Sequence, residues 1–346
     1  MKNALISRHL MTNYPAYPQI KKHKENAMIG LDPTLSRNQA CHKLLTHHFK
    51  HFLKYETLAL SNADDDVDSE VIHDMRVTIR RIESTLRIFK QDFKASQMSL
   101  LKNSLKNMSH RLSLVRDLDV FMENVAHYRD RLGYESTFDA KEDIAFLDLM
   151  VYFKRQRKRA MKKIFTLLKG REHVKFKGKV DDFLAPDAKK TKWMTIDKHI
   201  PCQIRHIAFS AVYKSYEIIR VRDESLKDAT IEQLHDFRKD CKNLRYLIEN
   251  FQDILGTEST EVLKEIKKVQ NYLGELNDTK VALNFLHYYF EYDVHVNKRP
   301  VPAFMLSYFA EVENKQQRLL DGFPVFWHQI NTPKLRRQLA LAIAEL

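Results

Sequence analysis

Apolar residues recur at intervals of three and four along most of the chain, the spacing that gathers them on one face of an α-helix. This pattern predicts helices over about 36–60, 97–127 and 139–169, and another that contains residues 72–89. No stretch shows the apolar–polar alternation typical of a half-buried strand. Only 7 Gly and 9 Pro interrupt the helical pattern in 346 residues. The sequence therefore predicts an all-α protein.

The segment 72–89 has two different faces. At about 100° per residue, one face is an apolar stripe made of Ile72, Met75, Ile79, Ile82, Leu86 and Phe89. Beside it, within an arc of about 60°, lies a row of basic side chains: His73, Arg76, Arg80 and Arg87. A solvated helix face normally mixes both signs of charge, and this arc contains no carboxylate. We interpret it as an anion-binding row, from which Arg81 points away.

The same arrangement returns in the second half of the chain. His235, Arg238, Lys242 and Arg245 repeat the basic row. A near-constant offset of 161 or 162 residues relates four helices, which indicates a duplicated unit. We expect two tandem four-helix bundles, with an N-terminal extension, a linker between the bundles and a C-terminal helical tail. The expected boundaries are 1–35 for the extension, 36–169 for the first bundle, 170–192 for the linker, 193–327 for the second bundle and 328–346 for the tail.

Charge narrows the choice of partner. The formal net charge is +13 and the pI is near 9.4, which favours a polyanion. No run approaches the ~18 apolar residues of a membrane span, and residues 1–30 lack the apolar core of a signal peptide, so we expect a cytoplasmic protein. The three cysteines form no CxxC and no even disulfide set. We expect no cofactor.

Two motifs, each present twice, carry a resemblance to a known family. His-Asp-x-Arg-x-x-x-[Arg/Lys] is followed about 43 residues later by Leu-x-x-x-[Arg/Asn]-Asp, in both halves. This order is similar to that of the CHAD family, the conserved histidine α-helical domain, over roughly residues 36–327. The resemblance implies two bundles related by a pseudo-twofold axis, a stand-alone domain, and a basic cleft that binds inorganic polyphosphate. It also implies that Asp117 and Asp278 occupy the acidic position of the second motif.

Other cations occupy equivalent positions in the two halves, or belong to the second motif, and extend the candidate site. The row from His73 to Arg87 spans about 21 Å, which suits a linear polyanion, and we expect Asp117 and Asp278 to orient its cations through charge-assisted bonds. At the position equivalent to Arg116, the second half has Asn277. We therefore expect the second half to bind the polyanion more weakly. The candidate polyphosphate-binding residues are His73, Arg76, Arg80, Arg87, Lys106, Arg116, Lys154, Arg157, His235, Arg238, Lys242, Arg245, Lys267, Lys315 and Arg318.

Three other functions stay open. A phosphohydrolase or kinase acting on polyphosphate would need metal-binding carboxylates, for which only Asp117 and Asp278 are candidates; we favour a protein that is not an enzyme. The basic run 154–163 would suit nucleic acid, but no zinc finger, RNP motif or helix-turn-helix accompanies it. The third is a scaffold that recruits proteins to polyphosphate granules.

Two local patterns are interpreted as coincidences. Residues 311–315 fit the ExExK signature of triphosphate tunnel enzymes, yet only 31 residues follow them, in a helical pattern, where that family needs a β-barrel. His47 and His51 have the spacing of metal ligands, but no carboxylate or cysteine completes the pair. We therefore expect no metal site.

Overall fold

The computed structural model describes residues 29–61, 67–93, 95–133, 140–184, 202–292 and 300–346. The first half contains α2 (Arg37–Ser61), α3 (Ser69–Ile88), the short 3₁₀ helix η1 (Lys90–Asp92), α4 (Ala95–Gly133), α5 (Ala140–Leu168) and α6 (Arg171–Leu184). The second half contains α7 (Ile204–Val221), η3 (Asp223–Leu226), α8 (Ile231–Phe251), α9 (Ser259–Tyr292), α10 (Ala303–Ile330) and α11 (Pro333–Ala344). The predicted all-α class and the predicted helices are confirmed.

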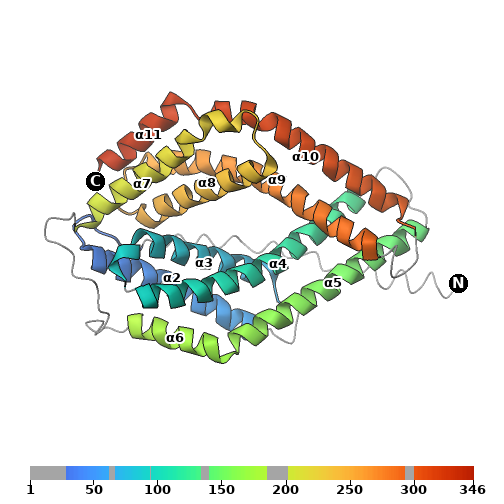
Figure 1. The fold of residues 1–346 in the computed structure, drawn as a ribbon, viewed down its shortest axis with the longest axis horizontal. Helices are drawn as coiled ribbons and strands as arrows, with labels where there is room; N and C mark the ends of the chain where they lie inside the picture. Colours follow the sequence, from blue (N-terminus) through green and yellow to red (C-terminus); the bar gives the residue numbers. More distant parts are fainter. Residues whose placement is uncertain (1–28, 62–66, 94, 134–139, 185–201, 293–299) are drawn as a thin grey trace.

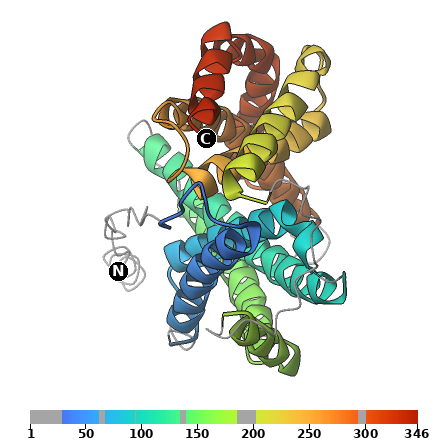
Figure 2. The same cartoon turned by 90° about the vertical axis from the view of Figure 1, so that its left-hand side faces the viewer.

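The contacts between the halves follow the order of the duplication. Helix α2 contacts α7, α3 contacts α8, α4 contacts α9 and α5 contacts α10, so these four helices each meet their own counterpart. The starts of α2 and α7 are tied in the same reciprocal way: Arg37 N donates to Cys202 O, and Ile204 N donates to Leu35 O, both at 2.8 Å. This is the contact pattern that a pseudo-twofold axis produces. Figure 2 shows the two halves one above the other.

The long helices join the halves at one end of the molecule. The distal parts of α4, α5, α9 and α10 converge at the right of Figure 1, away from α2, α6, α7 and α11. There the ring of Phe285 on α9 lies 5.4 Å from Phe121 on α4 and 5.6 Å from Phe153 on α5. Tyr128 on α4 lies 4.9 Å from Tyr308 on α10. The buried residues form one continuous core across both halves.

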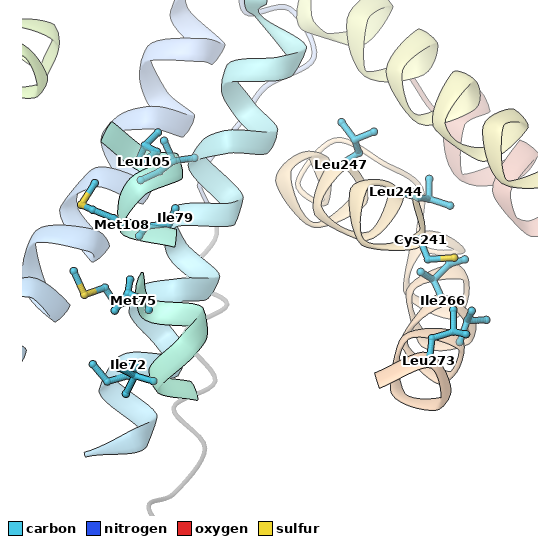
Figure 3. Packing of buried hydrophobic residues seen from close by; sticks show 14 of the residues in the cluster. Ile72, Met75, Ile79, Leu105, Met108, Cys241, Leu244, Leu247, Ile266 and Leu273 are labelled. Atoms are coloured by element: carbon cyan, nitrogen blue, oxygen red, sulfur yellow. The ribbon is translucent and has the colours of Figure 1, made fainter. Parts of the chain in front are cut away.

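The apolar stripe of α3 is buried as expected, and so is its counterpart in α8, which consists of Leu234, Phe237, Cys241, Leu244, Ile248 and Phe251. Figure 3 shows two groups of labelled side chains: the stripe of α3 lies beside Leu105 and Met108 of α4, and that of α8 lies beside Ile266 and Leu273 of α9. Burial of each stripe fixes the rotation of its helix. It thereby also fixes the direction of the basic row next to the stripe.

Side-chain caps define where these two helices begin. Asp68 accepts a hydrogen bond from Glu70 N at 2.9 Å at the start of α3. At the start of α8, Thr230 and Gln233 form a reciprocal capping box. Each cap satisfies backbone donors that the first helical turn leaves free. The acidic residues Glu70 and Glu232 in the first turns suit the positive end of each helix dipole.

The expected linker over 170–192 is wrong over most of its length, because α6 occupies Arg171–Leu184. His173, Phe176 and Val180 have helical spacing and are buried. Phe176 packs against Phe52 of α2, with ring centroids 6.3 Å apart. Helix α6 is therefore a fifth helix of the first half, and α11, within the expected C-terminal tail, is its counterpart. Residues 185–192 of the expected linker lie outside the described residues, as do residues 1–28 of the expected extension.

Candidate polyanion-binding site

The basic rows of α3 and α8 face each other between the two halves. Burial lowers the pKa of the Arg238 guanidinium, and Arg80 from the other half lowers it further, while Asp278 raises it. Burial also lowers the pKa of His73, and Arg245 of α8 is among the cations that add to this shift. Such coupling requires the side chains to be close. The two rows thus belong to one site.

Arg76 is held in this site with incomplete compensation. Burial and the neighbouring Arg80 lower the pKa of its guanidinium to about 10, against the opposing effect of Asp117. Its Nη1 lies 3.7 Å from Asp117 Oδ1. That distance is an ion pair and not a hydrogen bond. The guanidinium fork therefore keeps donors for a ligand.

Asp117 and Asp278 lie near each other between the rows. Burial raises the pKa of both carboxyl groups. Asp278 raises the pKa of Asp117 further, while Arg76 lowers it. For Asp278, Arg238 is the main cation that lowers the pKa. Each acid is thus placed by the arginine of its own half.

The two histidines are neutral at pH 7. Burial, Arg116 and Arg76 lower the pKa of His73 to about 4. Burial and Lys239 lower the pKa of His235, although its hydrogen bond with Asn277 raises it. A neutral imidazole donates one N–H. The structure therefore favours the neutral-donor form over the imidazolium form.

Several nitrogens of this site lack hydrogen-bond partners among the described residues. They are all buried, and they come from both halves: His73 Nδ1, Arg116 Nη1, Arg238 Nε and Arg245 Nε. Two of them have a carboxylate within ion-pair distance but not hydrogen-bonded: Arg116 Nη1 lies 3.8 Å from Glu123 and Arg245 Nε lies 3.4 Å from Glu249. Buried polar groups are normally bonded to protein or ordered water. An acceptor-rich ligand between the rows would satisfy them.

Arg80 and Lys242 occupy equivalent central positions of the two rows. Both side chains are half-buried. Within the described ranges, no carboxylate forms an ion pair with either of them. Arg87, at the end of the α3 row, is exposed. The middle of each row thus carries a cation without an ion pair, although Arg80 is close enough to Glu83 and Asp117 to lower the pKa of both carboxyl groups.

The other predicted cations differ in position. Lys106 and Lys267 are exposed, and each lies three helical turns before Asp117 or Asp278 on the same helix face. Lys154, Lys315 and Arg318 are exposed on α5 and α10. Lys315 Nζ pairs with Glu275 of α9 at 3.0 Å, so this lysine already has a carboxylate partner.

Arg157 is not a ligand residue but a buried structural one. Its Nε lies 2.5 Å from Asp119 Oδ1, and its Nη2 donates to Val67 O at 2.7 Å. Only 7% of the residue is exposed. The equivalence of Arg157 with Arg318 suggested a binding role, and the sequence signal against it was Asp119, next to the second motif. We remove Arg157 from the candidate ligand residues.

Arg81 does not point away from the site as expected. Its Nη2 donates to Glu249 Oε2 of α8 at 3.3 Å. Glu249 also pairs with Arg245 Nε at 3.4 Å. Arg81 therefore links the two halves beside the rows. Sequence reasoning missed this link because helix rotation alone does not show which partner helix lies opposite.

A buried polar network lies behind the same interface. His48 Nε2 is 3.0 Å from Asn250 Oδ1, and Asn250 Nδ2 donates to Thr85 Oγ1 at 3.2 Å. Burial lowers the pKa of His48 to about 3. Next to it, the His47 and His51 rings lie 4.6 Å apart. In the described part of the chain, no group of three or more His, Cys, Asp or Glu side chains is arranged to hold a metal ion.

Known proteins resemble this chain in sequence and fold. A CHAD domain family model matches residues 43–287. The crystal structure of the CHAD domain from the plant Ricinus communis superposes with a TM-score of 0.63 at 18% identity, covering 90% of this chain and 93% of that one. PptA from Streptomyces chartreusis superposes with a TM-score of 0.59 at 13% identity, covering 86% and 99%.

A curated relative is longer than this chain. The uncharacterized protein MT2285 of Mycobacterium tuberculosis strain CDC 1551 is 22% identical over 246 residues, which are 71% of this chain and 44% of that protein.

None of the described helices combines the length and hydropathy needed to cross a bilayer. The family model covers both basic rows and both copies of the second motif, and the chain belongs to the CHAD domain family.

Proposed function

We propose that this protein binds inorganic polyphosphate between the basic rows of α3 and α8 without transforming it. The observation that carries the proposal is the pair of facing rows whose central residues, Arg80 and Lys242, have no ion-pair partner in the described ranges. Cations held together without compensation repel one another. A polyanion bound between them would remove that repulsion.

A linear phosphate chain suits the shape of the rows. The α3 row spans about 21 Å from His73 to Arg87, longer than a single phosphate group. Arginine forks bind phosphate oxygens through two parallel hydrogen bonds, while lysine acts as a point charge. The neutral His73 adds a donor without adding charge. A chain of repeating phosphates can use all of these groups in succession.

Asp117 and Asp278 act in this proposal by orienting Arg76 and Arg238. Metal-assisted phosphoryl transfer needs carboxylates that hold a metal ion. Here burial raises the pKa of both acids, and each faces an arginine. The closeness of the two acids is still the one observation that favours a polyphosphate-processing enzyme. Magnesium-dependent phosphate release that is lost in Asp117→Asn would establish that alternative.

The test is direct binding of long-chain polyphosphate, duplex DNA and RNA over a series of salt concentrations. The variant Arg80→Ala/Lys242→Ala removes the two central cations, and Lys50→Ala/Lys214→Ala removes two exposed lysines from α2 and α7 as a charge-matched control. By analogy with nucleic acids, each lost phosphate contact lowers the salt slope by about one unit. We expect the row variant to lose about two units and at least about tenfold in affinity.

The control variant should keep both its slope and its affinity within about twofold of the original protein. Equal losses in the two variants would refute the placement of the ligand between the rows. Equal affinity for polyphosphate, DNA and RNA would refute the preference for polyphosphate. We further predict that the protein resides at polyphosphate granules, where it would recruit partner proteins.

A further inference from the structure

A cavity of 450 Å³ lies between α4, α5 and α6 of the first half. Four basic side chains line it: Arg111, Lys162, Lys163 and Arg171. At about 100° per residue, Arg111 lies on a different side of α4 from Lys106 and Asp117. The cavity is therefore separate from the rows of α3 and α8.

Arg111 is held in place by hydrogen bonds, whereas the other three cations are exposed and can reach a ligand. Arg111 Nε donates to Asn107 Oδ1 at 3.1 Å, and its Nη1 donates to Lys163 O at 3.4 Å. Lys162, Lys163 and Arg171 are exposed. Among the residues that the structure describes, no carboxylate lies within ion-pair distance of these three. The acid that lines the cavity, Glu172, pairs with Lys175 at 2.9 Å.

The duplication supplies an internal comparison. A cavity of 440 Å³ lies between α9, α10 and α11, the counterparts of α4, α5 and α6. Its charged lining is two lysines and two glutamates: Lys268, Lys334, Glu261 and Glu265. Lys268 Nζ pairs with Glu265 Oε1 at 2.7 Å. The second-half cavity is thus as large as the first but neutral, so the excess of positive charge belongs to particular side chains and not to the fold.

Helix ends do not account for the difference in charge. Helix α5 ends at Leu168 and α6 begins at Arg171, both at the first cavity. The dipole at a helix C-terminus is negative and that at an N-terminus is positive. The two ends oppose each other there. The basic side chains therefore set the sign of the potential.

We infer that the first-half cavity is a second anion site, which binds a triphosphate group, either free as tripolyphosphate or carried by a nucleotide. Its volume falls in the range of about 300–1,000 Å³ that small-ligand sites occupy. Four cations with one already paired acid match a compact ligand that carries several charges. Arg111 supplies a positive charge held in place by its hydrogen bonds, with Nη2 as the donor not used in them, and the exposed side chains of Lys162, Lys163 and Arg171 close around the remaining oxygens. The inference does not rest on the proposed function.

Calorimetric titration of the full chain in about 0.15 M salt tests this site with tripolyphosphate, ATP, AMP and sulfate. We expect tripolyphosphate or ATP to bind at micromolar concentration. Lys162→Ala/Arg171→Ala should weaken that binding at least tenfold. Lys158→Ala/Arg159→Ala, a charge-matched control on exposed positions of α5, should stay within twofold, as should the row variant Arg80→Ala/Lys242→Ala.

The relative affinities identify the ligand of the cavity. Tighter binding of ATP than of tripolyphosphate indicates a nucleotide, and the reverse indicates the inorganic chain. Binding that survives Lys162→Ala/Arg171→Ala but is lost in the row variant overturns the second site, as does a lack of binding or equal binding of AMP or sulfate. Acetylation of Lys162 and Lys163, followed by mass spectrometry, gives a readout without mutation. Tripolyphosphate should protect both lysines, and no protection overturns the inference.

Discussion

Two regions of this molecule contain the same residue types but use them in opposite ways. Inside the first half, Arg157 is buried with Asp119 at 2.5 Å, and Arg37 binds Asp92 through two hydrogen bonds of 2.9 and 2.8 Å. Between the halves, Arg80 and Lys242 have no ion-pair partner in the described ranges. The first kind of cation is neutralised by the fold. The second kind is left for something that the chain itself does not supply.

The difference shows that total charge is a poor guide to a binding site. A buried cation with its own carboxylate contributes to structure, and removing one partner leaves an uncompensated buried charge. A cation in the facing rows raises the energy of the unliganded protein through repulsion and burial, as the lowered pKa values of Arg76 and Arg238 indicate. Stability and binding should therefore respond to different mutations.

The largest expected effect comes from breaking the buried pair. Arg157→Met removes the cation bound to the buried Asp119 and the donor to Val67 O, and should lower the free energy of unfolding by about 3–5 kcal/mol. Urea denaturation measures this change. Polyphosphate affinity of the folded protein should stay within about twofold, since Arg157 lies outside the rows. A variant that keeps its stability but loses polyphosphate affinity would return Arg157 to the binding site.

Acid pH should lower the free energy of unfolding through His73 in the rows, by less than the loss of the buried Arg157–Asp119 pair. The pKa of His73 is about 4 in the folded protein and near 6.5 when the chain is unfolded. The unfolded chain therefore binds the proton more readily, so the stability is fully present above about pH 6.5 and decreases as the pH falls toward 4. Denaturation at pH 7 and 5 should show a loss that is larger in the original protein than in His73→Gln by an amount on the order of 1–2 kcal/mol, because His48 contributes equally to both.

The same histidine reports on ligand binding. Phosphate oxygens near His73 favour its imidazolium form, so polyphosphate should raise its pKa and the complex should take up a proton at pH 5–6. Calorimetry in two buffers of different ionisation enthalpy measures that uptake. The pKa of His48 is also lowered, but His48 lies in the network with Asn250. Its contribution is therefore the same in the original protein and in His73→Gln. Equal uptake in the original protein and His73→Gln would exclude His73 from the ligand.

Much of this organisation could be predicted from the sequence, and the misses share one cause. The helical period predicted α2, α3, α4 and α5, and the repeat predicted which helices are equivalent. Arg157 was misplaced because its partner Asp119 comes from another helix. Arg81 was misplaced because Glu249 comes from the other half. Periodicity gives the direction of a side chain around its own axis, whereas compensation depends on the helix that packs opposite.

The helix α6 shows a second limit. Its residues 171–184 include Gly178 and many charges, and the segment lies between the two repeats, so the sequence suggested a linker. In the structure, three buried side chains at helical spacing, His173, Phe176 and Val180, pack it against the bundle. His173 Nε2 also pairs with the buried Glu56 at 3.1 Å. A short apolar stripe carries little signal in sequence unless its partner surface is known.

The smallest predicted effect comes from giving the second half the arginine that the first half has at the equivalent position. Asn277 occupies the position equivalent to Arg116, and the residue equivalent to Glu123, which lies 3.8 Å from Arg116, is the neutral Asn284. Asn277→Arg would thus add a cation that lacks a counterpart of Glu123, with Asp278, which already hydrogen-bonds the Asn277 side chain, as its neighbouring acid. It should raise polyphosphate affinity a few-fold, about 0.7 kcal/mol, and steepen the salt slope by about one unit. Asn277→Gln has a long polar side chain without the charge and is expected to change neither. An arginine variant that binds no better than the glutamine one would mean that the second-half row receives no phosphate at this position.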